Sequence, residues 1–178
     1  MLKIKVKGYF ENGGLKADST ITALVKYHAD KARHNIETSS LLMEVSKDKE
    51  SKKKLKVSAD YIGYDWVISC GYYAMFHAAT AALAAIGIKA QSHESLIEGL
   101  EYHFVLKEKA IASDDIEKLK SAKKLDEKYV NRMRATKSKR NTAQYRADSV
   151  IAQKDAEKIY KNAIDFVDTI GSLIRGLK

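Results

Sequence analysis

The sequence predicts an all-α protein, an up-and-down bundle of about five helices, and three observations lead to this prediction. The 178 residues include no proline, which breaks helix interiors and usually makes up about 5% of a chain. Long stretches carry apolar residues at three- and four-residue steps, the period of an amphipathic helix. Strand-like alternation occurs in one short stretch. The length suits one sizeable core and is short for two domains.

The N-terminal region contains the alternating stretch, 2-LKIKVKGYF-10. It predicts a short strand or an extended arm within residues 1–17. Asp18 or Ser19 can cap the first long helix. The apolar face of that helix consists of Ile21, Leu24, Val25, His28, Ala32, Ile36 and Met43. The charged run 47-KDKESKKKLK-56 has little periodicity and predicts an exposed link or a frayed helix start.

The second helix is expected to begin near Val57 and to end at Gly87, which can serve as a C-terminal stop. From Trp66 onward it is apolar on nearly all sides, so we expect it at the centre of the fold. The stretch 66–88 is long enough to span a bilayer. Its alanine content and its interruptions by polar residues favour a buried core helix, and no membrane association is expected.

Three more helices are expected in the second half of the chain. Ser92 can cap a helix over 93–105, and Ser113, followed by two aspartates that suit the positive end of a helix dipole, starts the next. The stripe of that fourth helix is Ile116, Leu119, Ala122, Tyr129 and Met133, continued by Arg140. Asp148 is expected to cap the last helix. The apolar side of the last helix is Ala152, Ala156, Ile159, Ala163, Phe166, Val167, Ile170 and Ile174.

The net charge of +9 is concentrated in one segment. Between Lys118 and Arg146 the only acids are Asp126 and Glu127, so this segment alone carries the whole excess. Its basic residues are Lys118, Lys120, Lys123, Lys124, Lys128, Arg132, Arg134, Lys137, Lys139, Arg140 and Arg146. Such a concentrated field suggests a polyanionic partner, although an ordinary solvated helix face has the same composition.

Other kinds of site find little support. The single cysteine, Cys70, excludes an intrachain disulfide and is expected to be a small buried residue. The N-terminus lacks the pattern of a signal peptide, and a cytoplasmic location is expected. No histidines stand four residues apart, so no metal site is expected, and His77 is expected to be a hydrogen-bonded core residue. Because no glycine-rich phosphate loop is present, no cofactor is expected.

Four segments, in their order and spacing, carry a resemblance to a known family: 8-GYFENGGLKAD-18, 31-KARHNIETSSLLME-44, 72-YYAMFHAATAALAAIG-87 and 92-SHESLIEGLEYHFV-105. They are similar to the HEPN domain family, whose central helix carries a tyrosine pair, a phenylalanine–histidine and small residues. The first segment resembles the lead-in of a prokaryotic subgroup. The resemblance covers nearly the whole chain and implies a single HEPN-like helical domain over residues 1–178, with 1–17 as an arm.

The functional signature of that family is an arginine, four to six residues and then a histidine, often with asparagine after the arginine. In 140-RNTAQY-145, Arg140 and Asn141 match, while Tyr145 takes the histidine position. A subgroup with arginine, four residues and tyrosine has the same departure. The resemblance therefore places the catalytic positions at Arg140, Asn141 and Tyr145. The residues expected to bind nucleic acid are Arg132, Arg134, Lys137, Lys139, Arg140 and Arg146.

The tyrosine at position 145 leaves cleavage open. A metal-independent ribonuclease needs a base for the ribose 2′-hydroxyl and a cation for the phosphate. Histidine titrates near neutral pH, whereas tyrosine, with a pKa of about 10, is a poor base. Tyr145 can instead stack on a base, bond a phosphate oxygen or pack the turn into the last helix. Arg140 suits phosphate through its planar donor fork, so the site favours holding a phosphate over cutting beside it.

Two functions remain open. The first is an RNase-like component of a toxin–antitoxin or defence-type system, a homodimer in which Arg140 and Asn141 face their symmetry mates. The second is a non-catalytic module that binds RNA, a nucleotide or a partner protein, and the family resemblance implies a minimal nucleotidyltransferase as that partner. The missing histidine favours the second.

Overall fold

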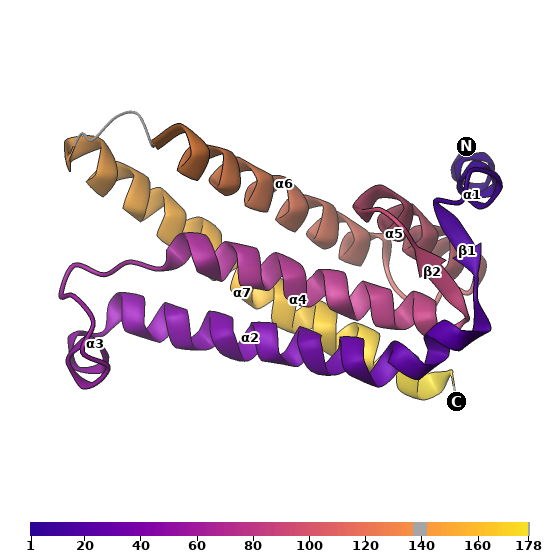
Figure 1. The fold of residues 1–178 in the computed structure, drawn as a ribbon, viewed down its shortest axis with the longest axis horizontal. Coiled ribbons are helices and arrows are strands. Elements are labelled where there is room, and N and C mark those ends of the chain that lie inside the picture. Colours follow the sequence, from indigo (N-terminus) through magenta and orange to yellow (C-terminus); the bar gives the residue numbers. More distant parts are fainter. Residues whose placement is uncertain (137–141, 178) are drawn as a thin grey trace.

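The structure, a computed structural model, describes residues 1–136 and 142–177, with side chains described outside 132–151. The described part contains seven α-helices and a two-stranded sheet. Four long helices, α2, α4, α6 and α7, make the bundle, and α5 and the sheet cover one end of it (Figure 1). The elements are α1 (Leu2–Glu11), β1 (Leu15–Ala17), the 3-10 helix η1 (Ser19–Leu24), α2 (Val25–Lys47), α3 (Lys49–Lys54), α4 (Tyr64–Ala85), β2 (Ile88–Ala90), α5 (His93–Leu100), the π-helix η2 (Glu101–Lys107), α6 (Ser113–Thr136) and α7 (Thr142–Gly176). The predicted all-α bundle is confirmed.

Helix α4 is the central helix, as its sequence predicts. It packs against α2, α5, α6 and α7. By length and composition it could cross a membrane, but 72% of its most apolar window is buried inside the fold, so it is a core helix. It begins at Tyr64 rather than near Val57. It ends at Ala85, and the expected stop, Gly87, follows with a positive φ of 71°, the left-handed conformation that glycine adopts without strain.

The N-terminal stretch is a helix, which corrects the prediction of a strand or extended arm. In a strand, Leu2, Ile4 and Val6 would share one face. Ile4 is instead 76% exposed, whereas Val6 is 2% exposed and Leu2 and Tyr9 pack beside it on the main core. The spacing 2, 6, 9 is helical, and burial on that face determines the outcome because the short sequence fits both periods.

The strand in this region lies further on. β1 pairs antiparallel with β2, with Leu15 opposite Ala90, and Leu15 is fully buried in the core. Three-residue strands are too short to show a period, so the sequence did not predict them. Asp18 caps as expected, accepting a hydrogen bond from the Thr20 backbone N–H at 3.0 Å, but it caps η1, and α2 follows from Val25.

The second half of the chain agrees with the sequence except at the start of α7. Ser92 forms a capping box with Ser95 at the start of α5, and Ser113 begins α6. Asp148 does not cap the last helix, because α7 begins at Thr142. The residues from 142 to 148 include neither glycine nor proline, so nothing in them interrupts a helix.

The core has two parts. The larger part surrounds α4 and α5 and includes Tyr72, Phe104 and Phe166. The smaller part joins the end of α2, the start of α4 and the facing turns of α6 and α7, and it consists of Met43, Tyr64, Val67, Ile68, Tyr129, Ala152 and Ala156. The predicted apolar stripes of α6 and α7 supply these contacts, so those stripes are confirmed where side chains are described.

Candidate nucleic-acid interface

The residues predicted to act on RNA lie in the sequence where α6 leads into α7. Four of them fall in the segment outside the described residues: Lys137, Lys139, Arg140 and Asn141. The other four belong to described helices, but their side chains lie outside the description: Arg132, Arg134, Tyr145 and Arg146. Their roles therefore stay predictions.

A hydrogen bond and an ion pair connect helices α6 and α7 near this part of the chain. The Tyr129 hydroxyl donates a hydrogen bond to the Asp155 carboxylate at 3.0 Å, and the Lys128 ammonium lies 3.4 Å from the same oxygen. Tyr129 is buried in the smaller core. It stands two turns before α6 ends at Thr136, so the packing that positions the basic segment extends to within about 10 Å of that end.

Most described lysines of the basic segment are already paired with carboxylates. Lys118 lies 3.1 Å from Asp115, Lys120 lies 3.0 Å from Glu117 and 3.2 Å from Glu101, Lys123 lies 2.6 Å from Glu94 and 3.1 Å from Glu127, and Lys128 pairs with Asp155. Of the five described lysines in this segment, Lys124 alone is exposed and forms no ion pair with a described residue. Three partners come from other elements, Glu94 from α5, Glu101 from η2 and Asp155 from α7, so a count along α6 overestimates its free positive charge.

The remaining positive charge lies in the later part of the segment. From residue 129 to residue 147 the sequence contains no acid and six basic residues, all of them on the predicted nucleic-acid list. Uncompensated cations raise the local positive potential far more than paired ones. Arg132 to Arg146 is therefore the part of the chain where the sequence predicts an anion-binding surface.

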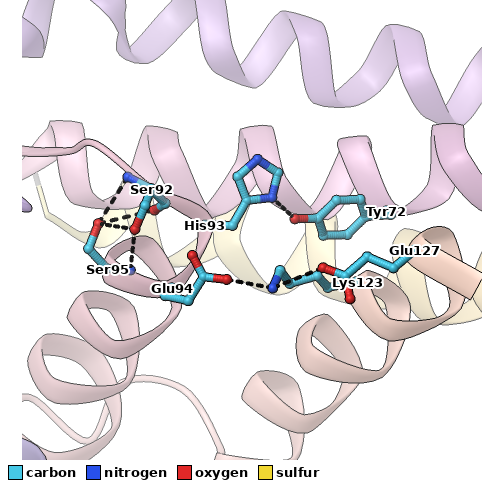
Figure 2. Close-up of polar contacts among 7 residues, drawn as sticks. All are labelled: Tyr72, Ser92, His93, Glu94, Ser95, Lys123 and Glu127. Carbon is cyan, nitrogen blue, oxygen red and sulfur yellow. Dashed lines mark hydrogen bonds and ion pairs between the residues drawn. The ribbon is translucent and has the colours of Figure 1, made fainter. Parts of the chain in front are cut away.

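The family-like residues of α4 and α5 form a joint between helices. The Tyr72 hydroxyl and His93 Nδ1 share a hydrogen bond, in which the donor depends on the histidine tautomer (Figure 2). Burial raises the pKa of Tyr72, which is 2% exposed, so the phenol stays neutral. The His93 ring also packs on Phe76, with ring centres 4.6 Å apart.

A second contact at this joint links α5 to α6. Lys123 lies between Glu94 of α5 and Glu127 of α6 (Figure 2). The hydrogen bond to Glu94 raises the pKa of Lys123 and lowers that of Glu94. Thirteen residues separate Lys123 from Thr136, about 20 Å of helix. This cluster thus holds the bundle together at a distance from the end of α6, and its charges compensate one another.

A histidine pair joins α2 to α4. The Nδ1 atoms of His28 and His77 are 3.1 Å apart, and the rings stack with centres 5.4 Å apart. His77 is thus hydrogen-bonded, as predicted, but partly rather than deeply buried. Burial lowers the pKa of both rings. The partners are 49 residues apart in sequence, so no spacing rule could reveal them. Within the described residues, no group of three or more potential ligands is placed to hold a metal ion.

Comparison with protein families gives one finding. The family model described as HEPN domain matches residues 25–173, from the first residue of α2 to the last turns of α7. The matched range includes all four long helices of the bundle and the segment that joins α6 to α7. A comparison with curated proteins finds none that matches.

Proposed function

Because the chain belongs to the HEPN domain family, we propose that it is an RNA-binding protein of a toxin–antitoxin or defence-type system. The family is generally associated with ribonuclease activity or nucleotide binding and with such systems. The proposed contact surface is the segment from Arg132 to Arg146, with Arg140 and Asn141 as its most specific contacts. A cytoplasmic location accompanies this proposal.

The observation that supports it is the division of charge along the segment. Four of the five described lysines of the segment, all except Lys124, are paired with carboxylates. The six cations that follow lie in a stretch, residues 129 to 147, that contains no acid. Cations near a phosphate chain release its condensed counterions, which drives binding without regard to base sequence. RNA therefore fits this surface better than a neutral ligand does.

The residue types at the proposed centre favour holding RNA. A guanidinium donates two parallel hydrogen bonds to a phosphate, and these charge-assisted bonds are about twice as strong as neutral ones. The Asn141 amide adds neutral donors. Tyr145 stands where a general base would be expected and lacks a pKa suited to that task. We therefore propose binding as the principal activity and treat metal-independent cleavage as an outcome to be measured.

The experiment combines binding with turnover. A fluorescent single-stranded RNA is titrated with the protein at low salt in a chelator, and the same mixtures are followed for cleavage. Arg140→Ala should weaken binding roughly tenfold or more, because a charge-assisted hydrogen bond contributes about 1.5–3 kcal/mol. Lys123→Gln is the matched control and should change affinity little, because Lys123 is already paired with Glu94 and Glu127.

The outcomes separate holding from cutting. If Tyr145→Phe abolishes cleavage while binding stays normal, the phenol takes part in catalysis. If intact RNA is recovered with the wild-type protein, the protein only binds. Absence of any RNA affinity at low salt would overturn the proposal and favour a non-catalytic module that binds a partner protein, a minimal nucleotidyltransferase. A nucleotidyltransferase gene beside this one would support that partner-protein function.

A homodimer is part of the proposal. One Arg140 and one Asn141 make a sparse phosphate site, whereas a two-fold axis would bring two copies of each together. Light scattering on the purified protein should therefore give twice the 19.9 kDa chain mass. A monomer alone at micromolar concentration would contradict this part.

A further inference from the structure

The lysine run at the end of α2 differs from the lysines of α6. Two of its six lysines have structural partners, since Lys47 pairs with Glu157 of α7 at 2.6 Å and Lys52, which is buried, donates to the Ala59 carbonyl. The other four are exposed and form no ion pair within the described residues: Lys49, Lys53, Lys54 and Lys56. These four cations therefore stay available to an external anion.

The acids of the same run form no ion pair with these lysines among the described residues. The Asp48 carboxylate instead caps α3, accepting a hydrogen bond from the Ser51 backbone N–H at 2.6 Å. Glu50 is the only other acid between residues 47 and 56. The run thus keeps a net positive charge in a protein whose α6 lysines are almost all paired.

Trp66 follows this run by ten residues in the sequence, stands on the first turn of α4 and is 55% exposed. The apolar pattern of α4 suggested that it would be buried, and the structure corrects that expectation. Tryptophan has a large amphipathic ring and is enriched at binding interfaces. Next to cations it has the composition of a base-stacking platform, in which each stacked base contributes about 1–3 kcal/mol.

The run and the basic segment lie at the same end of the bundle. The Gly63 N–H donates to the Ser46 hydroxyl at 2.9 Å, which closes the connection between α2 and α4. The pair Lys47–Glu157 ties that connection to α7. In Figure 1, α3 lies at the end of the bundle where α6 ends and α7 begins. One extended polyanion could therefore contact both regions.

We propose that Lys49, Lys53, Lys54, Lys56 and Trp66, named here the α3 surface, form a second contact surface for single-stranded RNA. The inference rests on the proposed function and adds to it the class of substrate. Four lysines fit successive phosphates, and an exposed indole fits an unpaired base. Duplex RNA offers phosphates to the lysines but keeps its bases stacked inside the helix, so it has no base for the indole to stack on.

The single tryptophan of the chain makes the test direct, because intrinsic tryptophan fluorescence reports on Trp66 alone. A single-stranded RNA of about 12 nucleotides, long enough for one to three binding sites of this kind, should quench that fluorescence on binding. Duplex RNA of the same length should bind with little quenching. Trp66→Leu should weaken binding of the single strand by about five- to a hundredfold, the range for one lost stacking contact.

The lysines are tested by the salt dependence of affinity. Changing all four to glutamine should make the log–log slope shallower by about 3 for the single strand, at about 0.7 per phosphate contact. The matched control changes four paired lysines, Lys118, Lys120, Lys123 and Lys128, to glutamine and so removes the same net charge. Its slope should change much less. Circular dichroism should show that both variants keep their helices.

Four results would overturn the inference. In the first, RNA binds in a way that depends on Arg140 while Trp66 fluorescence and the slope of the four-lysine variant stay unchanged. That result would refute the role of the α3 surface and leave the proposed function intact. Equal slope changes in both four-lysine variants would show a mere net-charge effect. Quenching by phosphatidylserine vesicles but not by RNA would assign the surface to a membrane. No RNA binding at all would remove both proposals.

Discussion

Replacing Tyr72 by phenylalanine tests whether the family-like residues of α4 and α5 are a structural joint. The ring is 2% exposed and phenylalanine keeps it, so packing is preserved and only the hydroxyl is lost. The loss removes the hydrogen bond to His93. A hydrogen bond of this kind contributes about 0.5–1.5 kcal/mol net. For a chain of this length, about 1 kcal/mol lowers the melting temperature by roughly 2–4 °C.

Urea unfolding of four proteins measures the effect: the wild type, Tyr72→Phe, His93→Gln and the double variant. We expect a coupling energy of about 1 kcal/mol between the two positions, within the usual range for residues in contact. Tyr73→Phe is the matched control. Its side chain is 42% exposed and forms no hydrogen bond among the described residues, so its effect should stay within about 0.5 kcal/mol.

Two results would refute this reasoning. If Tyr72→Phe is as harmless as Tyr73→Phe, or if the coupling is below about 0.3 kcal/mol, the hydrogen bond is not a joint. If Tyr72→Phe leaves stability unchanged but abolishes RNA binding, the pair belongs to a binding site instead.

Two further predictions concern the helix contacts. Burial lowers the pKa of His28 and His77, so below about pH 6.5 the unfolded chain binds more protons and the free energy of unfolding should decrease as the pH is lowered. Urea unfolding between about pH 8 and 5 checks this, and greater stability in acid would contradict it. A methyl group at Gly71 would lie 2.5 Å from Ile159 Cγ2 of α7, so Gly71→Ala should cost about 1–3 kcal/mol. Gly8→Ala, whose added methyl group meets open space, is the control. Equal effects of the two substitutions on the urea midpoint would contradict the predicted clash with Ile159.

The sequence predicts best those helices whose buried residues recur at three- and four-residue steps. The stripe of α7, from Ala156 through Ile159 and Ala163 to Phe166, is fully buried. Ser92 caps α5 because its side chain finds the next backbone N–H groups locally. In both cases residues close in sequence determine the structure.

Features that depend on distant residues could not be predicted. Glu94 neutralises Lys123 from another helix, and His28 meets His77 across 49 residues. The helix α1 forms because Val6 finds the core, which the alternating sequence does not reveal. The candidate site at Arg140 was located through the family signature, and its geometry stays a prediction.

The central claim, that the cations from Arg132 to Arg146 bind RNA, is tested most directly by the salt dependence of affinity for a short single-stranded RNA. Six phosphate contacts predict a log–log slope of about −4, or a roughly 300-fold loss of affinity between about 50 and 200 mM salt. Arg140→Gln should make the slope shallower by about 0.7 and weaken binding at every salt concentration, whereas Lys123→Gln should not. A slope near zero, or equal affinity of these two variants, would contradict the account.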